Sequence, residues 1–384
     1  MERKLRYGQI GGTLGAFIGG VHRKAIAFNE QAELVAGCFS ASNPENNRKC
    51  AEHFGISPDR TYDDYLAMAE AEGARTEDRL DFVMISTPNR FHYEEIKAFI
   101  ERGFHIVCEK PLCYTLEQAE EICKLAKEKD VLFCIPYTYV GFNMVKQAKQ
   151  LIEDGVIGEV FDVKAEYLQE WLLDEVSGCE GEKSLSTWRM DPYLSGISNC
   201  VGDIGSHIEQ TVAYMTGLRI KRLAAMLDYF EHELDLNANM LVEFDNGAHG
   251  TFSCSQVTAG YYNGLNIRIF GSLGAIEWRE EHPDFLTLTL KGQPPQTLTR
   301  GAHTSGNALR NNHLPSGHPE GLTTAFANIH KAFEDALIRR LDGKPNDGKW
   351  DLDFPDAEDG LLGVKFIYAS VESSKKDACW VEIR

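Results

Sequence analysis

In the first 137 residues, short apolar runs alternate with segments that carry helix-start signals. Asn43 precedes Pro44, the usual order of an N-cap and a first helical residue, and Thr115 with Gln118 forms a capping-box pattern. Thr61 is expected to cap a further helix. The apolar runs predict strands at 5–10, 33–39, 82–85, 105–108 and 131–135. Strands that alternate with helices predict a parallel sheet covered on both faces.

After about Tyr139, apolar and polar positions alternate over longer runs, as in strands that bury a single face. Asp245-Asn246-Gly247 predicts a tight hairpin turn between two of these runs. The runs predict a large, mainly antiparallel open sheet, with strands at 160–167, 223–229, 240–244, 248–254, 265–270 and 286–290. Helical patterns follow from Thr323 and over 356–374. We therefore expect two domains in the 384 residues, 1–137 and 138–384.

Residues 292–321 are rich in Gly, Pro, Asn and His and show little periodicity, which predicts a long loop. A loop of this length inside a compact domain is usually functional or mobile. The spacings of His303, His313 and His318 fit no helical or hairpin pair of metal ligands, so no metal site is expected. We expect a solvated loop from which His318 reaches the substrate.

Charge and cysteine usage narrow the class of protein. Lys and Arg number 39 against 58 Asp and Glu, a net charge of 39 − 58 = −19 without a long basic block. Binding to a phosphate backbone needs clustered cations, so neither nucleic acid nor an anionic membrane is an expected partner. No export signal or membrane-spanning run is visible. The ten cysteines include no Cys-x-x-Cys pair, which favours reduced thiols and a cytoplasmic location.

The tripeptide Glu109-Lys110-Pro111 directly follows the apolar run at 105–108. An open parallel sheet keeps its ligand crevice at the carboxyl ends of its strands, so Lys110 would be presented there. A lysine in this position can be desolvated and can exchange a proton with a substrate hydroxyl. A surface lysine after a strand is the alternative interpretation.

A glycine-dense turn, Gly11 to Gly20, follows the first strand. Such a turn lets the backbone approach a pyrophosphate, whose charge is met by N–H groups at the start of a helix. The run departs from G-x-G-x-x-G because Thr13 replaces an expected glycine. The second strand runs into Ser40, where the carboxylate that binds the ribose of NAD normally stands. NAD is favoured as the cofactor, and NADP stays possible.

Four motifs in this order resemble those of the Gfo/Idh/MocA oxidoreductases. They are the glycine turn, Ser86-Thr87-Pro88-Asn89 followed by His92, Cys108-Glu109-Lys110-Pro111, and Gly202-Asp203-Ile204-Gly205-Ser206-His207. The resemblance covers nearly the whole chain. It implies an α/β protein with an N-terminal Rossmann domain, built on a doubly wound parallel sheet, and a C-terminal α/β domain whose open sheet often forms a dimer or tetramer interface. It also implies oxidation or reduction of sugars, cyclic polyols and their derivatives with NAD(P), by a homo-oligomer.

The resemblance, together with the sequence patterns described above and aromatic stacking, gives expected roles to individual residues. Lys110, Asp203 and His207 match the catalytic positions. The expected cofactor-binding residues are Gly11, Thr13, Phe17, Ile18, Ser40, Thr87, Asn89, His92, Glu109, Lys110, Trp188 and Arg189. The expected substrate-binding residues are Lys110, Tyr137, Tyr167, Trp188, Asp203, His207 and His318. Apolar sugar faces stack on aromatic rings, and Trp188 and Tyr167 are the preferred candidates for a wall of the substrate site. Core packing is the alternative interpretation for Trp171, Trp188, Tyr137, Tyr139 and Tyr167.

Oxidation of a secondary alcohol passes a hydride to nicotinamide while the hydroxyl loses a proton, so one base must reach that hydroxyl. Asp203 and His207 lie four residues apart and share a face if a helix begins here. An imidazole, with an ordinary pKa of about 6.5, suits proton acceptance. We expect His207 to be the general base and Lys110 an orienting cation that stabilises the developing alkoxide, with Asp203 as an anchor. A helix histidine satisfied by an aspartate is the structural alternative.

Two other functions are compatible with this sequence. In the first, NAD is held permanently and transient oxidation enables an elimination or the cleavage of a glycoside. In the second, the chain is a nucleotide-binding sensor without catalysis, although a sensor has no need of Lys110, Asp203 and His207 together. The particular sugar, glycoside or polyol, the hydroxyl that reacts, the direction of the reaction and the oligomeric state are left open by the sequence.

Overall fold

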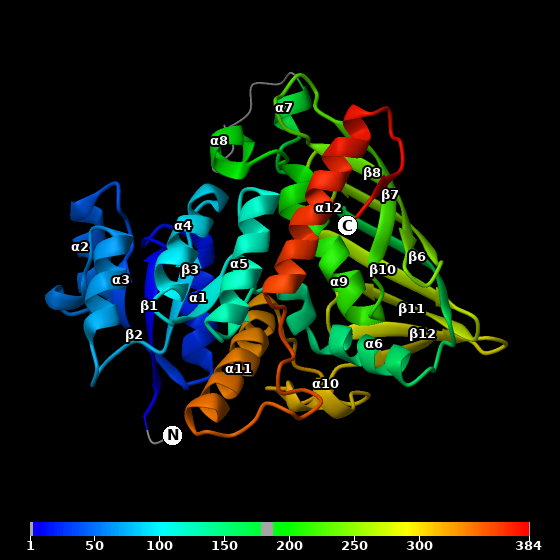
Figure 1. Cartoon of the computed structure of the whole chain (residues 1–384). Coiled ribbons are helices and arrows are strands. Elements are labelled where there is room, and N and C mark those ends of the chain that lie inside the picture. Colours follow the sequence, from blue (N-terminus) through cyan, green and yellow to red (C-terminus); the bar gives the residue numbers. More distant parts are fainter. Residues whose placement is uncertain (1–2, 178–186, 384) are drawn as a thin grey trace. The chain divides into compact units, whose positions relative to one another are not determined.

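The computed structural model of the chain describes residues 3–177 and 187–383. The chain divides into two compact units (Figure 1). The first comprises Met1–Thr138 with Leu322–Leu361, and the second comprises Tyr139–Gly321 with Leu362–Arg384. The sequence predicts that all residues from 138 onward belong to the second domain, whereas the segment 322–361 belongs to the first unit.

The first unit is built on a parallel sheet with the strand order β2-β1-β3-β4-β5. The chain moves outward in one direction from β1 to β2 and in the other from β3, so the topological switch lies between β1 and β3. Gly11 and Ser86 pair in register at the carboxyl ends of these two strands. The elements are β1 (Leu5–Gly11), α1 (Phe17–Phe28), β2 (Ala32–Cys38), α2 (Pro44–Phe54), a 3-10 turn (Pro58–Arg60), α3 (Tyr65–Ala74), β3 (Phe82–Ser86), α4 (Asn89–Ile100), β4 (His105–Cys108), α5 (Leu116–Glu128), β5 (Phe133–Cys134) and α11 (Leu322–Leu341).

The helix starts in this unit follow local side-chain chemistry. The side chain of Asn43 accepts a hydrogen bond from the backbone of α2, and both halves of the capping box form between Thr115 and Gln118, as predicted. The prediction for Thr61 was wrong. This residue pairs in extended conformation with Gly37, and α3 begins later because Asp64 caps the N–H groups of its first turn.

Packing explains why α11 belongs to the first unit. Phe326 and Ala327 join the buried cluster that contains Val21 and Ala25 of α1. One face of α11 therefore completes the apolar cover of α1, which a sheet of this size needs.

The second unit is built on a sheet of nine strands in the order β13-β12-β11-β10-β6-β9-β8-β7-β14. Among the strands of the described residues, only the pair β6 and β9 is parallel, so the sheet is mainly antiparallel, as predicted. The strands are β6 (Val160–Leu168), β7 (Ile220–Asp228), β8 (Asn237–Phe244), β9 (His249–Ser255), β10 (Gly264–Gly271), β11 (Gly274–Arg279), β12 (Phe285–Leu290), β13 (Gln296–Thr299) and β14 (Val381–Glu382).

Helices pack beside this sheet within the second unit, with α9 next to α6, β6 and β10. The helical elements are a 3-10 turn (Thr138–Gly141), α6 (Asn143–Glu153), α7 (Asp174–Ser177), a 3-10 turn (Thr187–Met190), α8 (Pro192–Ser195), a π-helical turn (Val201–Gly205), α9 (Ser206–Thr216), α10 (Gly306–Arg310) and α12 (Ala357–Lys375), at whose first turns the two units divide. Along β6 and β8, buried and accessible side chains alternate, because one face of the sheet is covered.

Several details of the second unit differ from the expectation. The hairpin at Asp245-Asn246-Gly247 is present between β8 and β9, as predicted. Residues 292–321, expected to lack regular structure, contain β13 and α10. The short strands β11, β13 and β14 were missed. β13 and β14 are the two outermost strands of the sheet, where the apolar signal is weak.

No helix among the described residues is long and apolar enough to cross a membrane. The nine cysteines within the described ranges carry free thiols, and Cys179 lies outside those ranges. His, Cys, Asp and Glu side chains of residues 3–177 and 187–383 form no group of three that could hold a metal ion.

Candidate active site

The turn between β1 and α1 is shaped by glycines. Gly11 and Gly12 have φ angles of +73° and +70°, a region that disfavours side chains. A Cβ added at Gly19 would lie 2.4 Å from the Cα of Gly12, so α1 packs directly against the turn. Ala16 caps α1 without a side-chain hydrogen bond, and the first turn carries no acidic residue. Backbone N–H groups at this helix start therefore suit the diphosphate of a dinucleotide.

The end of β2 is also compatible with dinucleotide binding, although its residues are less specific for it than the glycine turn. Cys38 and Phe39 are buried, and Asn47 accepts a hydrogen bond from the backbone N–H of Phe39 at 2.8 Å. Ser40 follows as a half-buried residue at the carboxyl end of the strand. A hydroxyl here carries no charge that would repel a ribose phosphate.

His92 ties the loop after β3 to the loop after β4. This fully buried histidine places Nε2 at 2.8 Å from the carbonyl oxygen of Thr87 and Nδ1 at 3.0 Å from that of Pro111. Burial lowers its pKa, so the neutral ring donates to one carbonyl at a time. The Thr87 hydroxyl donates to the buried carboxyl group of Glu95 at 2.6 Å. The two loops that carry the sequence motifs are therefore held against each other.

Glu109 and Lys110 stand where the sequence analysis expected them, directly after β4. Glu109 Oε1 lies 2.6 Å from Nε2 of His22, and Oε2 accepts a hydrogen bond from the backbone N–H of Lys110 at 3.2 Å. Burial alone would raise the pKa of Glu109, but His22, Lys110 and His92 together lower it below its ordinary value. The first unit therefore holds an ionised carboxylate next to a half-buried lysine, whose peptide bond to Pro111 is cis.

In the second unit, Asp203 lies in the π-helical turn that leads directly into α9. Its Oδ1 is 3.2 Å from Nε of Arg189, and its Oδ2 accepts a hydrogen bond from Gln256 at 3.0 Å. The buried Asn199 side chain in turn donates to Gln256 Oε1 at 2.7 Å. Two donors thus fix the orientation of the Asp203 carboxylate.

His207 follows Asp203 one turn later, in the first turn of α9, and is buried. The ring of Tyr139 packs edge-on against its imidazole with centroids 4.8 Å apart, and the ring of Tyr167 lies 6.3 Å away. The two tyrosine hydroxyls are hydrogen-bonded, and Tyr167 donates to Asn263 at 2.5 Å. Burial raises the pKa of both phenols, so the tyrosine pair that packs on His207 is uncharged.

The other expected site residues are dispersed. The guanidinium of Arg189 stacks on the ring of Trp188 at 4.8 Å. Phe17 is exposed in the first turn of α1, and Asn89 begins α4. Tyr137 is buried in the first unit.

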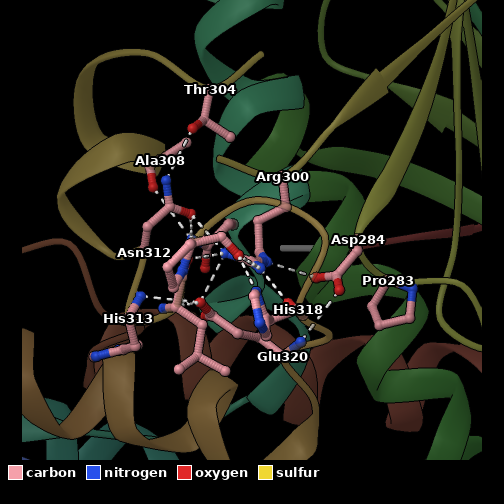
Figure 2. Close-up of polar contacts among 12 residues, drawn as sticks. Pro283, Asp284, Arg300, Thr304, Ala308, Asn312, His313, His318 and Glu320 are labelled. Atoms are coloured by element: carbon pink, nitrogen blue, oxygen red, sulfur yellow. Dashed lines mark hydrogen bonds and ion pairs between the residues drawn. The ribbon is translucent and has the colours of Figure 1, made fainter. Parts of the chain in front are cut away.

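His318 belongs to a segment organised by a buried arginine (Figure 2). Arg300, with 2% of its side chain exposed, pairs with Asp284 at 3.0 Å and with Glu320 at 2.8 Å. It also donates to the carbonyl oxygens of Leu314, Pro315 and His318. The backbone at His318 is therefore anchored while its side chain is exposed.

Several residues around these groups were not anticipated from the sequence, and each is polar. The buried ones are His22, Asn199, Gln256 and His330, and Asn263 is half-buried. Gln256 lies 53 positions from Asp203, and no local pattern marks it. His22 stands two positions after the glycine-dense turn, but its partner Glu109 is 87 positions away.

Family models match both halves of the chain. Residues 5–137 match an oxidoreductase family with an NAD-binding Rossmann fold, and residues 145–277 match a Gfo/Idh/MocA C-terminal domain. The chain belongs to the Gfo/Idh/MocA family of oxidoreductases. The resemblance and fold class predicted from the motifs are confirmed, and the protein is an NAD(P)-dependent oxidoreductase whose cofactor is NAD.

Several relatives are similar to this chain over nearly their whole length. An uncharacterised oxidoreductase of Bacillus subtilis is 33% identical over 100% of this chain and 98% of its own length. An inositol dehydrogenase homologue from Azotobacter vinelandii, solved with NAD+, is similar with 34% identity and a TM-score of 0.91 over 99% of this chain and 98% of its own. The same homologue was solved with NADH and myo-inositol, with 33% identity, a TM-score of 0.89 and the same two coverages. A levoglucosan dehydrogenase of Pseudarthrobacter phenanthrenivorans is 26% identical over 99% of this chain and 98% of its own.

Proposed function

We propose that this protein is an NAD-dependent dehydrogenase that oxidises a secondary alcohol of a sugar, a glycoside or a cyclic polyol. The observation that carries the proposal is the Asp203 carboxylate, which Arg189 and Gln256 hold one helical turn before His207. Support for the substrate class comes from the relatives, one solved with myo-inositol and another named for levoglucosan. Both compounds are neutral and carry ring hydroxyls.

In this proposal His207 removes the proton from the substrate hydroxyl. When NAD is bound, its nicotinamide would accept the hydride that leaves the carbon carrying this hydroxyl. Lys110 contributes its positive charge to the hydroxyl oxygen, which favours the alkoxide as the proton departs. Asp203 orients a neighbouring hydroxyl or the imidazole, since its carboxylate is itself restrained by two donors.

The packing of Tyr139 and Tyr167 against His207 suits a base that must keep one orientation. Because the rings pack on the imidazole and their hydroxyls are engaged with each other and Asn263, rotation of His207 would disturb a buried network. A preoriented base loses less entropy on reaching the transition state.

The experiment is an assay of the purified chain with NAD against inositol isomers, simple glycosides and anhydro-sugars, followed by NADH absorbance. With an active substrate, Lys110→Met and His207→Asn are expected to lower kcat by about 10²- to 10⁴-fold, the usual contribution of general acid–base groups. Lys124→Met is the matched control, because Lys124 is exposed and its ion pair with the exposed Glu128 is long, at 3.7 Å. Full turnover by folded Lys110→Met or His207→Asn would refute the roles assigned to these residues.

Product analysis separates this function from the alternative without net oxidation. A dehydrogenase forms NADH in equal amount to the ketone product. Turnover without accumulation of NADH and without added NAD would replace the proposal by redox-assisted elimination or glycoside cleavage. Binding of NAD without turnover of any polyol or glycoside tested would favour a nucleotide-binding sensor.

A further inference from the structure

A chain of three ionisable side chains lies buried in the first unit, and the roles proposed above leave two of them unused. Glu109 Oε1 is 2.6 Å from Nε2 of His22, and Nδ1 of His22 is 2.8 Å from Nε2 of His330. Both imidazoles have no exposed surface, and Glu109 is 8% exposed. The three residues come from the loop after β4, from α1 and from α11. The arrangement is therefore a linear relay that joins three separate segments.

The chemistry of the atoms gives this relay a direction. An ionised carboxylate only accepts hydrogen bonds, so Nε2 of His22 must carry the proton that points at Glu109. With its proton on Nε2 alone, His22 offers a lone pair at Nδ1, which accepts the proton on Nε2 of His330. Burial lowers the pKa of His330 well below its ordinary value, so this last ring is neutral. Both protons consequently point toward Glu109.

The far end of the relay agrees with this direction. Nδ1 of His330 is buried and makes no hydrogen bond with any described residue. In the directed arrangement this atom is a bare lone pair, whereas the reverse arrangement would place an unpaired N–H there. Edge-on packing of Phe326 on His22, with centroids 4.9 Å apart, restrains the ring that links the two ends.

At the other end of the relay, Glu109 contacts Lys110 of the Glu109-Lys110-Pro111 motif. The second oxygen of Glu109 accepts the backbone N–H of Lys110, so the carboxylate also restrains the residue that presents the proposed catalytic ammonium. The other ionisable groups near Glu109 are Lys110, His92 of α4 and the buried thiols of Cys108 and Cys134. Only His22 donates a side-chain hydrogen bond to Glu109 among the contacts of the described residues.

We propose that His22 and His330 are positioning residues, which hold the Glu109 carboxylate ionised and aimed for its part in binding NAD and in placing Lys110. The inference rests on the proposed function, and on the expectation from the sequence that Glu109 belongs to the cofactor-binding residues. The inference also gives a role to α11. This helix supplies His330, which contacts His22 although the two residues are 308 positions apart. A hydrogen-bonded imidazole pair can fix a carboxylate as outer partners fix metal-binding histidines.

The test compares two substitutions of His330 in the full chain. His330→Gln keeps an N–H donor near the position of Nε2, whereas His330→Phe keeps a ring of similar size without a donor. Phe326→Leu is the packing control, because it alters the contact on His22 and leaves both hydrogen bonds in place. Circular dichroism and thermal melting establish that each variant is folded.

The first readout is NAD affinity as a function of pH, which needs no substrate. Loss of the donor frees His22 to turn, so burial then dominates the pKa of Glu109. For His330→Phe we expect the dissociation constant of NAD to rise about tenfold, the effect of one charge-assisted hydrogen bond. The acidic limit of binding should move upward by about one pH unit. His330→Gln and Phe326→Leu should keep the wild-type affinity and pH limit.

The second readout is the tautomer of each ring, from nitrogen NMR of histidine-labelled protein. The relay requires a proton on Nε2 and none on Nδ1, in both His22 and His330 at neutral pH. A proton on Nδ1 of His22, or folded His330→Phe with the same affinity and pH limit as His330→Gln, would overturn the inference. Glu109→Gln with wild-type affinity and turnover would remove the role of Glu109 and the inference with it, while the dehydrogenase assay would still stand by itself.

Discussion

Replacement of Arg300 by methionine tests whether one buried cation organises the segment from 301 to 321. Glu320, 4% exposed in its side chain, accepts through Oε1 from Arg300 at 2.8 Å and from the backbone N–H groups of His313 and Leu314 at 2.9 and 2.8 Å. Asp284 accepts from Arg300 at 3.0 Å and from the backbone of Glu320 at 3.1 Å. Figure 2 shows Asp284 and Glu320 on the two sides of the Arg300 guanidinium.

The magnitude follows from what methionine leaves behind. Its side chain fills much of the same volume, but two carboxylates lose their cation and three carbonyl oxygens lose their donor. Breaking a buried ion pair by removing one partner costs about 3–5 kcal/mol. Because the segment lies between β13 and α11, we expect the loss as local opening, with amide exchange accelerated roughly a thousandfold for about 4 kcal/mol.

Hydrogen exchange read by mass spectrometry checks this expectation in peptides that cover 311–321. The amides of His313, Leu314 and Glu320 are the informative ones, and peptides from β10 serve as the internal reference. Arg279→Met is the matched control, since Arg279 is 61% exposed and its pair with Glu277 should contribute less than about 1 kcal/mol. Unchanged protection of 311–321 in Arg300→Met would show that the segment is held by something other than this cation.

Two further predictions concern groups around the motifs. Gln256→Leu removes a donor from Asp203 Oδ2, so kcat/KM should fall by about tenfold or more while NAD affinity is retained; equal losses in both would indicate general disruption. Burial raises the pKa of Glu95 to about 8 from 4.5, so the folded protein binds a proton that the unfolded chain releases, and stability is full below pH 4.5 and falls as pH rises toward 8. The stability of Glu95→Gln relative to wild type should therefore be about 3 kcal/mol more favourable at pH 8 than at pH 5 in urea unfolding, and parallel curves would contradict it.

Much of the architecture was predictable from short stretches of sequence. The capping residues at Asn43 and Thr115, the hairpin at 245–247 and the strand rhythm of both units depend on neighbours within a few positions. The same holds for the order of motifs that identified the family, and for the placement of Glu109 and Lys110 after β4. Thr61 failed because two cap-forming residues compete within a few positions, and Asp64 has the geometry that caps the helix.

The tertiary structure alone decided which polar groups meet. His330 reaches His22 across 308 positions, Gln256 reaches Asp203 across 53, and α11 joins the first unit instead of the second. Periodicity and capping are written in local sequence, because they depend on backbone geometry over one or two turns. A buried hydrogen bond instead depends on where distant segments pack, and its two partners carry no sequence mark of each other until the chain has folded.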